Sequence, residues 1–310
     1  MRGRSSEVAE TLSRRSVDVC CIQEVRWRGA STRMIQGKDT QYKMFWVGAD
    51  KGTGGVGILV AESWIENVID VNRVNDRIML VKLLLDKTIV VFVSVYAPQQ
   101  GRPEDEKDRF YEELLLTMSA FGSNEVIMLC GDLNGHVGRT ISGYENVHGG
   151  YGYGIRNPEG ERILELGDAM NMVVCNTFFK NRENRLITYP SGGNQSQIDY
   201  IMTKKSDAKR VMDVKIIQSE ECITQHKLLI ADMKISNAKA KKKKFTPKRK
   251  VWKLKEEEVK ASFLAELQTG IASTSNPSIN VKWNLMEEAL LTAADKSCGW
   301  TKKPPRHQVT

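Results

Sequence analysis

The sequence predicts an α/β fold in four layers, a sandwich of two packed, mostly antiparallel sheets with helices on the outer faces. Two observations predict it. Short apolar runs rich in β-branched residues, bounded by Gly, Asp or Pro, recur along residues 1–235 and indicate many buried strands. Segments with helical periodicity are few and widely spaced, which favours outer helices over a helix after every strand. A region of 235 residues is within the usual length of one domain.

The chain is expected to open as a helix followed by a strand. In SSEVAETLSRR, serine caps precede Val8 and Leu12 at helical spacing, and VDVCCIQE follows as a short buried strand. A sheet meander is then predicted over YKMFWVG, GGVGILVA, DRIMLVKLLLD and TIVVFVSVYAP.

The second half of residues 1–235 adds two helices and more strands. PEDEKDRFYEELLLTMSAF has acidic residues in its first turn and places Phe110, Leu114 and Met118 on one face, so a helix is expected there. A further helix is predicted over EGERILELGDAM. Strands are predicted at EVIMLC, MVVCN, QIDYIMT, DVKII and HKLLIADMKI.

Residues 236–310 are predicted to form a separate, basic tail. They contain 16 of the 46 Lys and Arg but only 7 of the 38 Asp and Glu, which leaves 30 against 31 for residues 1–235. Residues 236–250 are interpreted as a linker that binds DNA phosphates, serves as a nuclear-import signal, or is simply a solvated spacer. Two amphipathic helices, KLKEEEVKASFLAEL and VKWNLMEEALLTAADKSC, are expected within residues 251–310. The candidate nucleic-acid contacts are Lys241, Lys242, Lys243, Lys244, Lys248, Arg249 and Lys250.

Composition bears on where the protein functions. The sequence has no run of about 18 apolar residues, and MRGRSSEVAE lacks the apolar core of a secretory signal. The six cysteines lie mostly in apolar runs without metal-binding spacing, which indicates reduced thiols. We therefore expect a nuclear or cytoplasmic protein that is not secreted and does not act at a membrane.

Polar side chains stand beside the ends of the predicted strands, and Asp199 lies inside QIDYIM; the ends of strands on a rigid sheet are where catalytic groups tend to gather. Each of them singly is equally compatible with turn, capping or structural chemistry. Their joint pattern is what indicates a site. These residues are Glu24, Tyr96, Asp132, Asn134, Asp199 and His226.

The segments CIQEVRW, SVYAPQ, CGDLNGHVG, QIDYIM and TQHKLLIADM, in this order and spacing, resemble the endonuclease/exonuclease/phosphatase superfamily over residues 5–235. Within that superfamily, VDVCCIQEVRWRG and CGWTKKPPRH are most similar to the endonuclease domain of RTE-type non-LTR retrotransposons and to craniofacial development protein 2-like host proteins. A reverse transcriptase follows the endonuclease in those elements. The resemblance implies that residues 251–310 lead toward such a region, which is absent here.

The resemblance implies a metal-dependent endonuclease that nicks DNA. Such chemistry needs a hard cation, a base for the attacking water, and donors for the charge that develops on the phosphate. Glu24 is implied to bind Mg²⁺, with Mn²⁺ as an alternative. Asp132 is implied to activate the water, and His226 to donate to a phosphate oxygen while Asp199 holds its ring.

Two further residues receive roles from the resemblance. Asn134 would contact the phosphate or position the water, and Tyr96 would contact the phosphate or assist the leaving group. His136 receives no catalytic role and is interpreted as a loop histidine.

The sequence departs from the superfamily pattern in two places. Thr224-Gln225-His226 stands where the family usually has Ser-Asp-His, so a neutral amide replaces a carboxylate near the metal. Family domains also begin with a strand that bears a catalytic Asn, and that first strand is expected to be missing here. Two alternatives to the DNA endonuclease therefore stay open: a catalytically weak, retroelement-derived binding or scaffold protein, and a phosphatase acting on a small phosphoester.

Overall fold

The computed structural model describes residues 3–222, 226–235, 247, 249–271 and 279–301. The chain divides into two compact units, residues 1–237 and residues 238–310. None of the described helices is both long enough and apolar enough to cross a membrane.

Residues 1–237 contain two main sheets. The first has the order β1 (Val19–Gln23), β4 (Val56–Ala61), β3 (Gln41–Gly48) and β2 (Gly29–Gln36), all antiparallel. The second has the order β5 (Val68–Asn75), β6 (Ile78–Leu85), β7 (Thr88–Tyr96), β8 (Val126–Asp132), β12 (Asp199–Lys204) and β9 (Met172–Val174). Its neighbours are antiparallel except β7 and β8, which are parallel.

Two antiparallel hairpins and several helices complete this unit. The hairpins are β10 (Tyr189–Ser191) with β11 (Asn194–Ser196), and β13 (Val211–Cys222) with β14 (His226–Met233). The α-helices are α1 (Ser5–Arg14), α2 (Glu104–Ser119) and α3 (Pro158–Ala169). Short 3-10 helices are η1 (Glu62–Asn67), η2 (Cys175–Phe178), η3 (Glu183–Arg185) and η4 (Ala208–Arg210).

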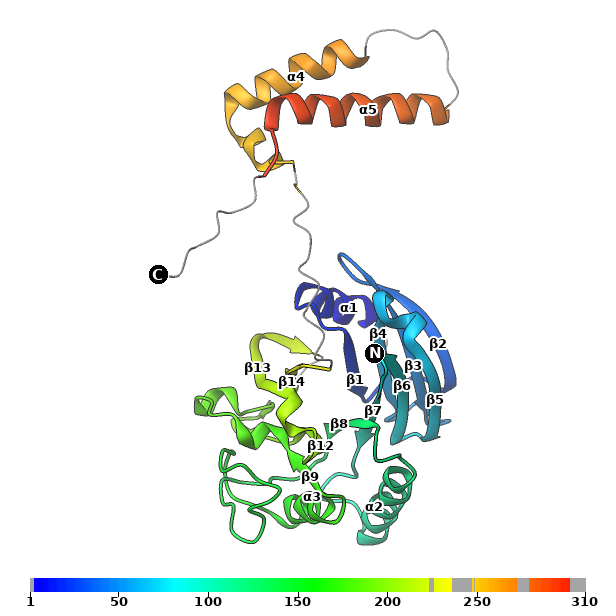
Figure 1. Cartoon of the computed structure of the whole chain (residues 1–310), viewed down its shortest axis with the longest axis vertical. Coiled ribbons are helices and arrows are strands. Elements are labelled where there is room, and N and C mark those ends of the chain that lie inside the picture. The colour runs from blue at the N-terminus through cyan, green and yellow to red at the C-terminus, as the bar shows by residue number, and fades with distance from the viewer. Residues whose placement is uncertain (1–2, 223–225, 236–246, 248, 272–278, 302–310) are drawn as a thin grey trace. The chain divides into compact units, whose positions relative to one another are not determined.

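Three apolar clusters lie between four layers, which confirms the predicted α/β sandwich. Val8 and Leu12 of α1 pack against the outer face of the β1–β4 sheet. A second cluster fills the space between the two sheets, where Ile58 and Val81 belong to opposite walls. Helices α2 and α3 cover the far face of the second sheet, as Figure 1 shows. Burial of this apolar surface is the main force that holds the layers together.

The β13–β14 hairpin extends the layer of the β1–β4 sheet. Leu229 and Ala231 of β14 pack on the cluster between the sheets, whereas Leu228 packs on the cluster beneath α1. Alternate residues of β14 thus face the same two layers as those of β1. The hairpin and β1 are separate pieces of one layer.

The helices form where the sequence predicts them. In α2, the first turn contains Glu104, Asp105 and Glu106, whose carboxylates interact favourably with the positive end of the helix dipole. The helix buries the predicted apolar face, which includes Phe110, Leu114 and Met118. In α3, the Asn157 side chain caps the helix by accepting a hydrogen bond from the Gly160 N–H.

The second unit contains η5 (Val251–Lys255), α4 (Glu257–Ile271) and α5 (Ile279–Cys298), so the two tail helices are present. Arg249 pairs with Asp295 and lies 4.6 Å over the Trp300 ring, and the Lys250 N–H donates to Gly299. These contacts attach Arg249 and Lys250, the last two residues of the predicted linker, to the helical unit. Their contact with DNA stays a prediction. Lys241, Lys242, Lys243, Lys244 and Lys248 lie outside the described residues.

Candidate active site

The registers of three neighbouring strands place three polar residues in a row at one end of the second sheet. Tyr96 of β7 is opposite Asp132 of β8, and Asp132 is opposite Asp199 of β12. Opposite residues on paired strands project to the same face. Strands β7 and β8 can approach closely here because residue 131 is a glycine. A Cβ at Gly131 would lie 2.0 Å from the carbonyl oxygen of Val95 in β7.

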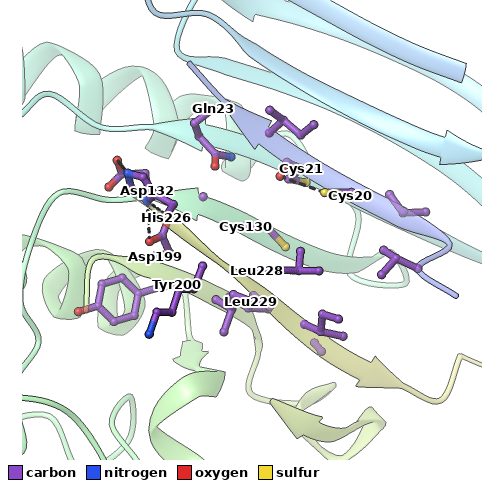
Figure 2. Close-up of a pocket in the computed structure, with 18 of the residues that line it drawn as sticks. Cys20, Cys21, Gln23, Cys130, Asp132, Asp199, Tyr200, His226, Leu228 and Leu229 are labelled. Carbon is purple, nitrogen blue, oxygen red and sulfur yellow. Dashed lines mark hydrogen bonds and ion pairs between the residues drawn. The ribbon is translucent and has the colours of Figure 1, made fainter. Parts of the chain in front are cut away.

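His226, the first residue of β14, completes this row. Its Nδ1 lies 3.0 Å from one Asp199 carboxylate oxygen and 3.2 Å from the other. Its Nε2 faces Asp132 with 3.9 Å between Nε2 and Oδ2. The Tyr189 ring packs on the imidazole at 4.7 Å between centroids. Figure 2 shows Asp132, Asp199 and His226 together at one end of a cavity.

Glu24 approaches from the other sheet, directly after β1. The Tyr96 hydroxyl donates to Glu24 Oε1 at 2.8 Å, and Arg26 pairs with Glu24 Oε2 at 2.5 Å. Glu24 and Arg26 both have left-handed backbone conformations, with φ of 51° and 55°. Residues with side chains adopt this region rarely, and such strain is concentrated at functional sites.

The loop after β8 is fixed by hydrogen bonds. Asn134 also has a positive φ of 49°, its N–H donates to Asp132 Oδ1, and its side-chain amide donates to the Ala97 carbonyl at 2.9 Å. The buried Tyr200 hydroxyl lies 3.0 Å from the Gly135 carbonyl and accepts from the Val137 N–H. Asn134 is therefore part of the scaffold that positions Asp132.

The charges in this site interact strongly. Burial and the neighbouring Asp199 carboxylate raise the pKa of Asp132 to about 8. Burial opposes the charged form of His226, but the hydrogen bond and the charge of Asp199 outweigh it and raise the pKa of His226 to about 9. Burial also disfavours the Glu24 carboxylate, yet the donors Tyr96 and Arg26 more than compensate and lower its pKa.

The structure allows a partial test of metal binding. Among the described residues, no three His, Cys, Asp or Glu side chains converge closely enough to hold a metal ion between them. Mg²⁺ needs only one or two protein carboxylates, because it keeps several of its waters. Glu24 suits such an ion, since its side chain is 40% exposed and opens on the same cavity as Asp132. Burial and, after it, the charge of Asp199 disfavour the Asp132 carboxylate, and a cation beside Glu24 would offset both effects.

A family model, that of the endonuclease/exonuclease/phosphatase family, matches residues 1–218. The chain belongs to this family. One curated protein to which this chain is similar is craniofacial development protein 2 from Bos taurus. The two are 29% identical over 236 residues, which are 75% of this chain and 39% of the relative. The Tragulus javanicus protein of the same name is 28% identical over 236 residues. The chain therefore spans about two fifths of the length of these relatives.

Solved structures share the family fold. An AP endonuclease from Archaeoglobus fulgidus has a TM-score of 0.55 and 18% identity, over 75% of this chain and 95% of that one. The AP endonuclease LMAP from Leishmania major has a TM-score of 0.54 and 12% identity, over 75% and 83%. The endonuclease domain of TRAS1, a telomere-specific non-LTR retrotransposon, has a TM-score of 0.51 and 14% identity, over 74% and 90%.

The structure brings together the six residues that the sequence singled out, and it adds others that sequence reasoning missed. Tyr189, which packs on His226, lies in a hairpin whose sequence YPSGGNQS indicates only a turn. Arg26 is one of several arginines after β1, and no sequence signal separates it from Arg28. Thr224 and Gln225 of the last motif lie outside the described residues. His136 also lines the cavity.

Proposed function

We propose that this protein hydrolyses phosphodiester bonds with the help of Mg²⁺ and nicks DNA, as an endonuclease of the retrotransposon type. The observation that carries the proposal is the convergence of Glu24, Asp132 and the Asp199–His226 pair at one end of a single cavity. Membership of the family and similarity to AP and retrotransposon endonucleases support a nucleic-acid substrate.

Glu24 would hold the ion, with Mn²⁺ as a substitute. A hard cation there would polarise a phosphate oxygen and lower the pKa of Asp132, so that Asp132 can accept a proton near neutral pH. Tyr96 keeps the Glu24 carboxylate oriented through its hydroxyl. Tyr96 would therefore have two roles: the contact with phosphate that the resemblance implies, and the positioning of Glu24.

The remaining steps belong to side chains on the second sheet and β14. Asp132, held by the Asn134 N–H, would take a proton from the attacking water. His226 is protonated at neutral pH because Asp199 raises its pKa, so its Nε2–H is available to a phosphate oxygen as negative charge builds up. Asp199 fixes the ring by accepting from Nδ1.

The test is nicking of supercoiled plasmid with Mg²⁺ and with EDTA. Parent protein should nick only with the metal, and Asp132→Asn, Glu24→Ala and His226→Ala should each reduce the rate about a hundredfold or more. Asp105→Asn, a surface carboxylate of α2, is the matched control and should nick normally. Parent-level nicking by Asp132→Asn would refute the assignment. Release of phosphate from an inositol phosphate without nicking would instead indicate a phosphatase, and neither activity would indicate a binding protein.

A further inference from the structure

Arg26 pairs with the carboxylate to which the proposed function assigns the metal ion. Glu24 has two carboxylate oxygens, and both have a partner. The Tyr96 hydroxyl donates to Oε1 at 2.8 Å, and the Arg26 guanidinium pairs with Oε2 at 2.5 Å. A divalent cation that binds Glu24 would therefore meet a positively charged group already in contact with the same carboxylate, and like charges at such short range repel each other. The cation and the guanidinium compete for Glu24.

The two partners of Glu24 differ in how firmly they are held. Tyr96 is buried and belongs to β7, an inner strand of its sheet. The Arg26 side chain is 62% exposed, and within the described part of the chain Glu24 is its one ion-pair and hydrogen-bond partner. Exposed ion pairs contribute little to stability, because water competes for both groups and the long side chains lose freedom. The bond from Tyr96 is therefore expected to persist, whereas the pair with Arg26 exchanges easily.

The backbone that carries Arg26 is fixed independently of this ion pair. The Arg26 N–H donates to the Gly54 carbonyl at 2.8 Å. The N–H of the preceding residue, the buried Val25, donates to the Gly55 carbonyl at 3.1 Å. These two bonds hold the backbone against the loop before β4. The guanidinium can therefore leave Glu24 by rotation about its own side-chain bonds, without a change in the fold.

A guanidinium released from Glu24 would remain beside the candidate active site. Arg26 lines the same cavity as Asp132 and His226, which stand together in Figure 2. Tyr96 links the two regions, because it is bonded to Glu24 and lies opposite Asp132 in register. A planar guanidinium pairs with phosphate through two parallel hydrogen bonds. A phosphate group held between Asp132 and His226 would thus offer Arg26 a new partner.

We propose that Arg26 changes partner during the reaction. Without a metal ion, its guanidinium is the counterion of Glu24, and when a divalent cation binds Glu24, the guanidinium turns to a phosphate group of the substrate. This inference rests on the metal role that the proposed function gives Glu24. The charge of Glu24 is balanced in both states, and the additional donor to phosphate becomes available only when the cation is present. Metal binding and substrate binding would therefore strengthen each other.

The first measurement is metal binding by the full chain without DNA, with Mn²⁺ alone as the probe and the paramagnetic resonance signal of free Mn²⁺ as the readout. Arg26→Gln removes the competing charge and should bind Mn²⁺ about three- to tenfold more tightly than the parent. Arg26→Lys keeps the charge and should bind as the parent does. Arg28→Gln is the matched control, because Arg28 is exposed and does not line the cavity. Glu24→Ala should lose the site.

The second measurement compares DNA binding in Mg²⁺ and in EDTA by fluorescence anisotropy. Asp132→Asn is the background, because the proposed function makes this variant unable to cleave. Adding Arg26→Gln should weaken binding of a short duplex at least about threefold in Mg²⁺ but little in EDTA, where Arg26 is paired with Glu24. Adding Arg28→Gln should have the same effect in both conditions. Circular dichroism establishes that each variant is folded.

The outcomes separate this inference from the proposed function. Mn²⁺ binding that Glu24→Ala leaves unchanged would refute the metal role of Glu24, and the proposed function with it. Equal Mn²⁺ affinities of the parent and Arg26→Gln, with binding still lost in Glu24→Ala, would overturn the exchange of partners alone. An equal loss of DNA affinity from Arg26→Gln in Mg²⁺ and in EDTA would also overturn it, because Arg26 would then contact DNA whether or not the cation is bound.

Discussion

At the residue scale, the proton equilibria of Asp132 and His226 link the stability of the fold to pH. The pKa of Asp132 is raised from 3.8 to about 8, and that of His226 from 6.5 to about 9. In both cases the folded protein binds the proton more tightly than the unfolded chain, so the stabilisation is lost as pH rises through the folded pKa. We expect the free energy of unfolding in EDTA to decrease from about pH 4 to pH 9, most steeply between about pH 6.5 and pH 8, where both groups contribute. Urea unfolding measures it, and Asp132→Asn should show a flatter decrease. A slope identical to that of the parent would contradict the proton assignment.

A second prediction at this scale concerns Tyr96, whose hydroxyl orients the proposed metal ligand Glu24 at 2.8 Å. Loss of a group that orients a ligand typically lowers metal affinity or activity by about 10- to 100-fold. Tyr96→Phe should therefore raise the Mg²⁺ concentration needed for half-maximal nicking by about that factor. Tyr144→Phe is the matched control, because the Tyr144 hydroxyl also donates to a carboxylate, that of Glu161, away from the site. Equal Mg²⁺ titrations for the two variants would exclude a positioning role for Tyr96.

At the scale of elements, the parallel pair β7 and β8 depends on Gly131. A Cβ at this position would lie 2.0 Å from the carbonyl oxygen of Val95. This oxygen belongs to the backbone, so relieving the clash would require the two strands to move apart. We expect Gly131→Ala to lower the free energy of unfolding by about 3 kcal/mol or more and to displace Asp132, which follows directly. Gly101→Ala is the control, because no atom lies within 4 Å of its Cβ. Chemical denaturation compares the two, and similar midpoints would show that the strands can separate without cost.

The same scale explains which elements the sequence could predict. Buried strands such as β4 and β8 are continuous apolar runs, and α2 has a buried stripe, so both patterns were recognisable. β2 was not predicted, because all its positions except Ile35 are exposed and its residues carry no apolar alternation. β10 and β11 are three-residue strands, too short for a pattern. β5 was not predicted either, because its residues are partly buried or exposed and several of them are polar.

The candidate site was predictable only in part. Asp132 follows a predicted strand and Asp199 lies inside another, but the adjacency of the two residues depends on the register of β8 with β12, which no local pattern specifies. The contact of Tyr96 with Glu24 joins two sheets and depends on packing between them. Stacking of Tyr189 on His226 arises from a hairpin that the sequence indicates only as a turn. Such contacts follow from tertiary structure, which sequence patterns do not contain.

At the scale of the whole molecule, the proposed function would divide DNA cleavage and DNA attachment between the two units. All residues that line the active-site cavity belong to residues 1–237, which have their own three apolar clusters. The excess positive charge belongs to residues 236–310, with 16 Lys and Arg against 7 Asp and Glu. A basic segment joined to a nearly neutral catalytic unit would raise affinity for any DNA without selecting a sequence.

The last prediction tests this division. Removing residues 238–310 should leave a folded protein whose metal-dependent activity is unchanged, because the three apolar clusters and the candidate site residues of the first unit lie within residues 1–237. Its affinity for unrelated DNA duplexes should fall by a similar factor for each, and the slope of log K against log salt should become shallower by about 0.9 for each phosphate that the protein no longer neutralises. Replacing Lys241, Lys242, Lys243 and Lys244 by Gln in the full chain should reproduce most of this change. Replacing Lys253, Lys255, Lys260 and Lys282 removes equal charge from the helical unit and should change the slope less. Equal effects of the two quadruple variants would mean that net charge alone, and not the basic segment before the helices, determines DNA affinity.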